Sequence, residues 1–223
     1  MNNVLHLDYL PGHPEMTLYQ NREMFHITTD TALLGEFLNI KHKDKVLDVG
    51  TNNGALLLYA SMSKPLFMTG IDINEKAVEI AKKNMDLHNI TNSKILVADA
   101  KKYYEPDGYD VIICNPPFFN TKDDESKNRN QDLLKARHED CFSMNDIFEC
   151  IKRNLKDNGR FYVLHRADRL NDIFEAILKN GLRVSNFKPI YDQNKEDAVC
   201  FVIEGKRSKT IASKISSYLV VKR

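Results

Sequence analysis

Aspartates close three successive apolar stretches of the chain, at Asp48, Asp72 and Asp99. The first of them opens a turn over residues 48–54, where glycines let a ligand approach the backbone and a following helix would offer free amides. Asp72 is placed to accept hydrogen bonds from two ribose hydroxyls, and Asp99 from an adenine amino group. Any one of these residues could belong to an ordinary turn or helix cap, but three together favour a nucleotide-type ligand.

The stretches that carry these residues are continuous apolar runs, which indicate strands buried on both faces. Segments with helical periodicity lie between them, and this alternation predicts a parallel sheet. The carboxyl ends of parallel strands share one edge, where ligands bind in open α/β sheets. We predict strands over 45–50, 66–72, 94–99, 109–115 and 160–165, helices over 54–62, 74–89, 143–155 and 168–179, and a C-terminal antiparallel hairpin over 182–190 and 197–204.

The 223 residues are 42% hydrophobic and 28% charged, which is typical of a folded domain and excludes global disorder. Apolar runs are too short to span a membrane, and the N-terminus lacks a signal-peptide pattern. The four cysteines lie far apart, which favours a reducing cytoplasm and predicts neither a metal site nor disulfides. We predict a single domain over 1–223, with an N-terminal extension (1–44), a core (45–205) and a basic C-terminal segment (206–223).

Two segments fall outside the alternating pattern. Residues 119–142 form a long polar connection, and a loop of that length is usually functional or disordered. Residues 205–223 contain six Lys or Arg and no acidic residue. The rest of the chain therefore has 26 basic and 31 acidic residues, a net charge of −5. Such a segment either contacts phosphates or is a solvated terminus.

The motifs DVGTNNG, GIDI and VADA resemble those of Rossmann-like class I S-adenosylmethionine methyltransferases. The dinucleotide fingerprint G-x-G-x-x-G is absent, since the two glycines of the turn give G-x-x-x-G. Asn52 stands where the family usually has glycine, and asparagine tolerates left-handed backbone best after glycine. The resemblance implies a seven-stranded, mostly parallel sheet and S-adenosylmethionine as cofactor. It assigns cofactor binding to Asp48, Gly50, Gly54, Asp72, Ile73, Asp99, Ala100 and Asn115.

The stretch Asn115-Pro116-Pro117-Phe118 resembles the (N/D)-P-P-(Y/F/W) motif of methyltransferases that act on planar nitrogen, which implies that these four residues are catalytic. An exocyclic amine is a poor nucleophile because its lone pair is delocalised into the ring, so it must be held with that lone pair aimed at the methyl group. The Asn115 oxygen and the Pro116 carbonyl can accept the two amino hydrogens, and proline stiffens the backbone. Phe118 can stack on the flat substrate group.

Two flanking stretches resemble bacterial tRNA(Val) adenine-N6-methyltransferases, which modify position 37 beside the anticodon. Residues 19–34 resemble their Q…F…D-[ST]-x-L-L stretch, and residues 136–139 their A-R-H-E element. In that family the first stretch borders the cofactor, which would place Thr28, Thr29 or Asp30 near its methionine end. Alternatively, Thr29 or Asp30 caps a helix over 31–39.

The resemblance as a whole implies methyl transfer to adenine N6 at position 37 of tRNA(Val). A tRNA would be the partner, and we infer neither a membrane nor an obligate protein partner. The local charge predicts RNA contacts at Arg137, Lys206, Arg207, Lys209 and Lys214. The alternatives are a guanine-N2 methyltransferase for ribosomal RNA, a protein glutamine methyltransferase, and a non-catalytic RNA-binding module on a degenerate methyltransferase fold. The non-catalytic module is disfavoured because four motif residues are intact, namely Asp48, Asp72, Asp99 and Asn115.

Overall fold

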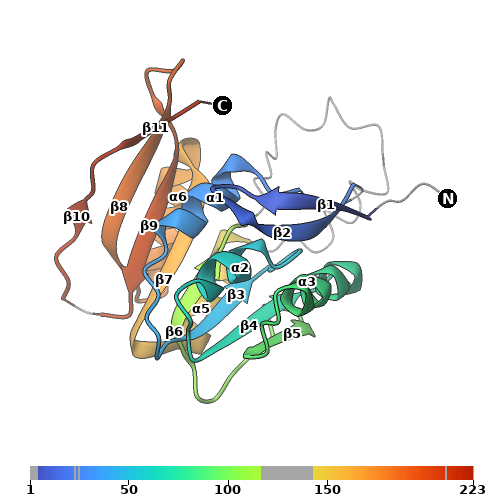
Figure 1. Cartoon of the computed structure of the whole chain (residues 1–223). Helices are drawn as coiled ribbons and strands as arrows, with labels where there is room; N and C mark the ends of the chain where they lie inside the picture. Colours follow the sequence, from blue (N-terminus) through green and yellow to red (C-terminus); the bar gives the residue numbers. More distant parts are fainter. Residues whose placement is uncertain (1–4, 23, 25, 117–142, 209, 223) are drawn as a thin grey trace, which may run out of the picture.

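A central sheet dominates the computed structural model, which describes residues 5–22, 24, 26–116, 143–208 and 210–222 (Figure 1). Its strand order is β10-β8-β9-β7-β6-β3-β4-β5, and β11 also pairs with β8. β9 runs antiparallel to β7 and β8, and the other pairings of this sheet are parallel, which confirms the predicted mostly parallel sheet with a C-terminal hairpin. The strands are β3 (Lys45–Val49), β4 (Phe67–Asp72), β5 (Ser93–Val97), β6 (Tyr109–Cys114), β7 (Leu155–Arg166), β8 (Arg183–Asp192), β9 (Ala198–Lys206), β10 (Lys214–Ile215) and β11 (Leu219–Val221).

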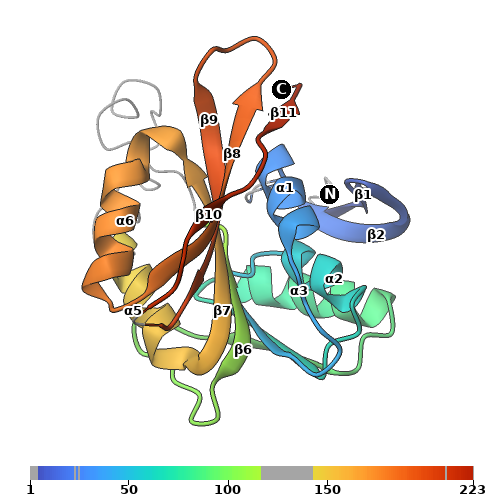
Figure 2. The same cartoon turned by 90° about the vertical axis from the view of Figure 1, so that its left-hand side faces the viewer.

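Helices cover both faces of the sheet (Figure 2). Successive residues of one strand therefore enter different cores: Val46 packs with the side of α2 and α3, and Leu47 with the side of α5 and α6. This two-sided burial is why the strands read as continuous apolar runs. The helices are α1 (Thr29–Phe37), α2 (Ala55–Ser61), α3 (Glu75–Leu87), α5 (Met144–Asn154) and α6 (Leu170–Lys179), with a short 3₁₀ turn η2 (Ala167–Arg169) before α6. None of the helices in the described ranges is long and apolar enough to cross a membrane.

The N-terminal extension folds as an antiparallel hairpin, β1 (Leu5–Leu10) and β2 (His13–Asn21), followed by α1. The sequence of residues 1–44 offers a helix over 31–39 as one of two alternatives, and α1 begins two residues earlier; it does not predict the hairpin. Its turn contains Gly12, whose φ of 80° lies in the left-handed region that glycine tolerates. Leu10 and Leu18 are buried in the core shared with α2 and α3, so the hairpin is an integral layer of the fold.

The basic C-terminal segment extends the sheet beyond the seven predicted strands. Lys214 of β10 pairs with Asn186 of β8, and residues 219–221 of β11 pair with residues 190–192. Between these two contacts β8 carries Lys188 and Pro189. Residues 214–221 of this segment therefore lie along the edge of β8 and are not a solvated tail.

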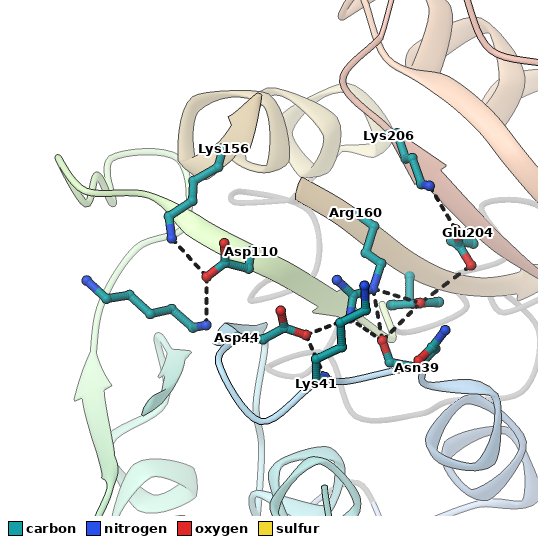
Figure 3. A network of polar contacts seen from close by, with 10 residues as sticks. Asn39, Lys41, Asp44, Asp110, Lys156, Arg160, Glu204 and Lys206 are labelled. Atoms are coloured by element: carbon teal, nitrogen blue, oxygen red, sulfur yellow. Dashed lines mark hydrogen bonds and ion pairs between the residues drawn. The ribbon is translucent and has the colours of Figure 1, made fainter. Parts of the chain in front are cut away.

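A polar network joins the amino ends of the central strands (Figure 3). The Arg160 guanidinium lies 2.6 Å from the Asp44 carboxylate and donates to the Asn39 carbonyl. Beside it, Lys156 and Asp110 form an ion pair of 2.8 Å. This network fixes the edge of the sheet opposite to the carboxyl ends of the strands.

Candidate functional site

The turn after β3 has an unusual backbone. Gly50, Asn52 and Gly54 have φ angles of 73°, 49° and 80°, so three of five consecutive residues are left-handed. The left-handed Asn52 agrees with the expectation that asparagine replaces the usual glycine there. A Cβ atom at Gly50 would meet nothing within 4 Å, so the space beside this backbone is open. The amides of Gly50 and Thr51 both donate to the Ile71 carbonyl at 2.9 Å, which ties the turn to β4.

Buried polar atoms beneath this turn point to a polar ligand. The Asp48 carboxylate is fully buried, and its Oδ2 accepts a 2.8 Å hydrogen bond from the Thr51 hydroxyl. Its Oδ1 and the Nδ2 of Asn53 have no hydrogen-bond partner among the described residues. Burial, with a further contribution from the charge of Asp72, raises the pKa of Asp48 to about 7 even though the Thr51 bond lowers it. Leaving buried polar atoms unpaired costs about 1–3 kcal/mol each, so a ligand that pairs with them is favoured.

Asp72 ends β4 beside the same turn. Its two carboxylate oxygens accept 2.9 Å bonds from the amides of Asn52 and Asn74, so the residue also holds the turn in place. Ile73 follows it and is 68% exposed, which offers an apolar surface next to the carboxylate. Asp99 and Ala100 follow β5, and the amide of Ala98 donates to the Asp72 carbonyl at 2.9 Å. The predicted cofactor residues therefore gather at one edge of the sheet.

Asn115 follows β6 at this edge, since Cys114 pairs with Val49. Its Nδ2 donates to the hydroxyl of Thr31 at 3.3 Å, while its Oδ1 is buried with no partner among the described residues. Pro116 is buried beside it. The amide is thus held by its nitrogen and presents its oxygen as an acceptor. Pro117 and Phe118, which complete the motif, lie outside the described residues.

The N-terminus of α1 supplies a residue that the sequence pattern had not singled out, Thr31. The N-cap position is occupied by Thr28, which makes no side-chain capping bond, so the expectation of a cap at Thr29 or Asp30 is wrong. Asp30 is buried, and its Oδ1 lies 3.9 Å from the Cys200 sulfur of β9. The segment over 28–31 therefore lies between β6 and β9, at the carboxyl edge of the sheet.

The predicted RNA-binding residues do not gather at this edge. Lys206 ends β9 opposite Arg160, with its ammonium 3.9 Å from Glu204 in the network of the amino edge (Figure 3). Arg207 contacts the Asp157 carboxylate at 3.3 Å and donates to the Leu155 carbonyl. Lys214 is exposed on β10. Arg137 and Lys209 lie outside the described residues.

A sheet of this order, with glycine-containing and acidic turns at the carboxyl ends of its parallel strands, defines the class I methyltransferase architecture. Residues 40–214 match the family model described as a methyltransferase domain, and the chain belongs to this family. S-adenosylmethionine is the cofactor of this class. The unpaired atoms of Asp48 and Asn53, the open space at Gly50 and the carboxylates of Asp72 and Asp99 fit a ligand with amino, hydroxyl and adenine groups.

Similar proteins carry a more specific name. The chain is 27% identical to a tRNA1(Val) (adenine(37)-N6)-methyltransferase of Aliivibrio salmonicida, over 80% of this chain and 76% of the relative. It is 30% identical to one of a Flavobacteriaceae bacterium (strain 3519-10), over 67% of this chain and 63% of the relative. The resemblance inferred from the motifs is thereby confirmed.

Solved structures share the fold. A predicted O-methyltransferase of Agrobacterium tumefaciens has a TM-score of 0.64 at 14% identity, with 86% of each chain covered. The M. jannaschii protein TYW2, solved in complex with AdoMet, has a TM-score of 0.61 at 14% identity, with 93% of this chain and 89% of that one covered.

Proposed function

We propose that this protein transfers the methyl group of S-adenosylmethionine to N6 of an adenine, at position 37 of tRNA(Val). The observation that carries the proposal is the buried Oδ1 of Asn115, which has no partner among the described residues and lies at the same edge as the cofactor residues. The names of the similar proteins support the choice of tRNA and of adenine.

In this proposal residues at the carboxyl ends of β3, β4 and β5 would hold the cofactor. Asp72 accepts hydrogen bonds from the ribose hydroxyls, and Asp99 with Ala100 holds the adenine amino group. Ile73 packs against the adenine ring, and the turn with Gly50 and Gly54 admits the ligand close to the backbone. Asp48 and Asn115 complete the pocket toward the methionine end.

Catalysis in this site is mainly positioning. S-adenosylmethionine supplies a methyl group that its sulfonium has already activated. Asn115 Oδ1 and the Pro116 carbonyl accept the two hydrogens of the target amine, which aims its lone pair at the methyl carbon. Pro117 stiffens this stretch, and Phe118 stacks on the base. No base is required before transfer, since the amine becomes acidic only once it is methylated and can then lose its proton to water.

The RNA contacts and the organisation of the chain belong to the same proposal. We place the catalytic core at residues 45–205 and assign the hairpin segment (1–44) and the basic segment (206–223) as additions to it. Arg137, Lys206, Arg207, Lys209 and Lys214 contact the tRNA backbone, because a pocket for one extruded base cannot hold a whole tRNA. A tRNA substrate supports a cytoplasmic location, which we propose.

The experiment that tests the function is methyl transfer from labelled S-adenosylmethionine to bulk tRNA, to ribosomal RNA, to a tRNA(Val) transcript and to bulk protein. We expect N6-methyladenosine in the transcript, and none in a matched transcript with guanosine at position 37. Label in N2-methylguanosine or in protein glutamine would contradict the proposed substrate. Binding of the cofactor without transfer to any of these acceptors would favour a non-catalytic module.

A further inference from the structure

Asn84 is a buried amide in an otherwise apolar stripe of α3. Its neighbours on this face, Ala77, Ala81 and Met85, belong to the core, and Asn84 itself is 0% exposed. A buried amide is destabilising unless its polar atoms are paired. Those of Asn84 are paired: Oδ1 accepts from the Tyr19 amide at 2.7 Å, and Nδ2 donates to the Tyr19 carbonyl at 3.1 Å and to the Asn53 carbonyl at 2.8 Å.

These bonds join two parts of the molecule that are distant in sequence. The pair to Tyr19 reproduces the two-bond pattern of a neighbouring strand, so the Asn84 side chain continues the edge of β2. The third bond holds the carbonyl of Asn53, in the turn assigned to the cofactor. One side chain therefore links the N-terminal hairpin, α3 and this turn.

The turn depends on such external bonds because its own conformation is unfavourable. The left-handed backbone of Asn52 is disfavoured for residues other than glycine, and only glycine adopts the flanking conformations without penalty. Asp72 holds the turn from one side through the Asn52 amide, and Asn84 holds it from the other through the Asn53 carbonyl.

His88, the C-cap residue that follows α3, provides a natural comparison four residues after Asn84. Its Nε2 donates to the Thr17 carbonyl of β2 at 2.6 Å, so it also attaches the hairpin to α3. Unlike Asn84, its side chain makes no hydrogen bond to residues 50–54 in the part of the chain that the structure describes. Substitutions at these two residues can therefore distinguish the effect of attaching the hairpin from the effect of supporting the turn.

We propose that Asn84 is a positioning residue for the cofactor, which it serves by fixing the Asn53 carbonyl and hence the shape of residues 50–54. The inference rests on the proposed assignment of this turn to S-adenosylmethionine. It predicts that removing the Asn84 side chain weakens cofactor binding more than loosening the attachment of the hairpin does by itself.

The test compares Asn84→Ala with His88→Ala in the full chain, with S-adenosylmethionine affinity measured by calorimetry and the melting temperature measured without ligand. Both variants should melt earlier than the wild type. Asn84→Ala should weaken cofactor binding by about tenfold or more, whereas His88→Ala should stay within about twofold. Equal affinity in Asn84→Ala and the wild type, or equal weakening in both variants, would overturn the inference.

Two further measurements cover the case in which Asn84→Ala does not fold. Asn84→Asp at pH 8 keeps the acceptor for the Tyr19 amide but removes the Nδ2 donor to both the Tyr19 and the Asn53 carbonyls, so it should show the same loss of affinity. In His88→Ala, hydrogen exchange should accelerate in the β2 amides and remain unchanged at residues 51–54; acceleration at both would contradict the inference. A wild-type protein that binds no S-adenosylmethionine would instead reject the proposed function.

Discussion

At the scale of single residues, the hydroxyl of Thr31 decides how the Asn115 amide is oriented. It accepts from Nδ2 at 3.3 Å, which leaves Oδ1 as the atom available to a substrate amine. Because valine has the shape of threonine without the hydroxyl, Thr31→Val should lower kcat about tenfold while cofactor affinity is unchanged. Steady-state kinetics with tRNA, together with calorimetry for the cofactor, measure the two quantities separately.

Two further variants give the expected lower and upper limits of the effect on kcat. Thr29→Val alters an exposed threonine in the same turn of α1 and should leave kcat unchanged. Asn115→Ala removes the acceptor itself and should cost about 10²-fold or more in kcat. Full turnover in Thr31→Val would show that the hydroxyl does not orient the amide.

Asp48 predicts a pH dependence of stability. Its carboxyl ionises near 3.8 when unfolded and at about 7 when folded, so the ligand-free protein binds this proton more tightly than the unfolded chain. This contribution to stability is therefore present at low pH and is lost as the pH rises from about 4 to 7. The loss amounts to about 4 kcal/mol, since the pKa shift of about three units counts about 1.36 kcal/mol per unit.

Asp48→Asn tests this dependence, because asparagine keeps an acceptor for Thr51 and carries no charge. Urea unfolding of both proteins without cofactor should show that the variant gains in unfolding free energy over the wild type between pH 5 and pH 8, by about 2–3 kcal/mol. If the two proteins lose stability in parallel between these pH values, the burial of the Asp48 charge is not what sets the dependence.

The residue types of the site could be predicted from sequence because strand-end acids and the Asn-Pro-Pro-Phe motif are local patterns. Thr31 and Asn84 could not, since their roles arise from contacts to Asn115 and Tyr19, at separations of 84 and 65 residues. A signal was present for Asn84, namely a polar residue beside Ala81 and Met85 in an apolar stripe. The stripe itself does not indicate which backbone groups form hydrogen bonds with the Asn84 amide.

At the scale of elements, α1 and α2 approach closely at Gly35. A Cβ atom there would lie 2.4 Å from the ring of Tyr59, whose hydroxyl donates to the Pro11 carbonyl of the N-terminal hairpin at 2.5 Å. Gly35→Ala should therefore destabilise the protein by about 1–3 kcal/mol, although alanine is favoured over glycine in helices by about 1 kcal/mol. Chemical denaturation measures the difference.

A double-mutant cycle isolates the contact. In a Tyr59→Leu background the smaller and more flexible side chain can move aside, so the same Gly35→Ala change should cost less than in the wild type. An equal cost in both backgrounds would place the strain elsewhere in α1.

The central strands could be predicted from their continuous apolar runs because β3, β4 and β6 are buried on both faces. The hairpin of β1 and β2 escaped prediction, since its strands are half exposed and carry no continuous apolar run. Its signal is the Pro11-Gly12 pair between two alternating stretches, which favours a hairpin turn. The pairing of β10 and β11 with β8 likewise depends on contacts between distant segments, which no local pattern encodes.

At the scale of the whole molecule, the basic segment divides into two regions with different surroundings. Lys206 and Arg207 lie at the amino edge, each within 4.0 Å of a carboxylate, whereas Lys214 and Lys222 are exposed near β8. A nearby carboxylate offsets the attraction of a cation for phosphate. The second pair should therefore contribute more to tRNA affinity.

Two double variants that remove the same charge test this prediction. Lys214→Gln with Lys222→Gln should weaken tRNA binding and lower the log–log salt slope by about 0.7–0.9 per lost contact, whereas Lys206→Gln with Arg207→Gln should change the slope less. A salt titration of tRNA affinity provides the measurement. The reverse ranking would mean that the RNA reaches the amino edge, and no change in either variant would exclude the segment from RNA binding.

The seating of β10 and β11 on β8 also bears on how the protein behaves at high concentration. An uncovered strand edge is a template on which other chains can add and aggregate. Here β10 covers β8 at residues 186–187 and β11 covers it at 190–192, while a lysine and a proline occupy the gap. These are residues that resist the addition of a further strand. The short strands β10 and β11, which carry Lys214 and precede Lys222, thus close the edge of the sheet against self-association. A variant that loses them should therefore aggregate even where its active site remains intact.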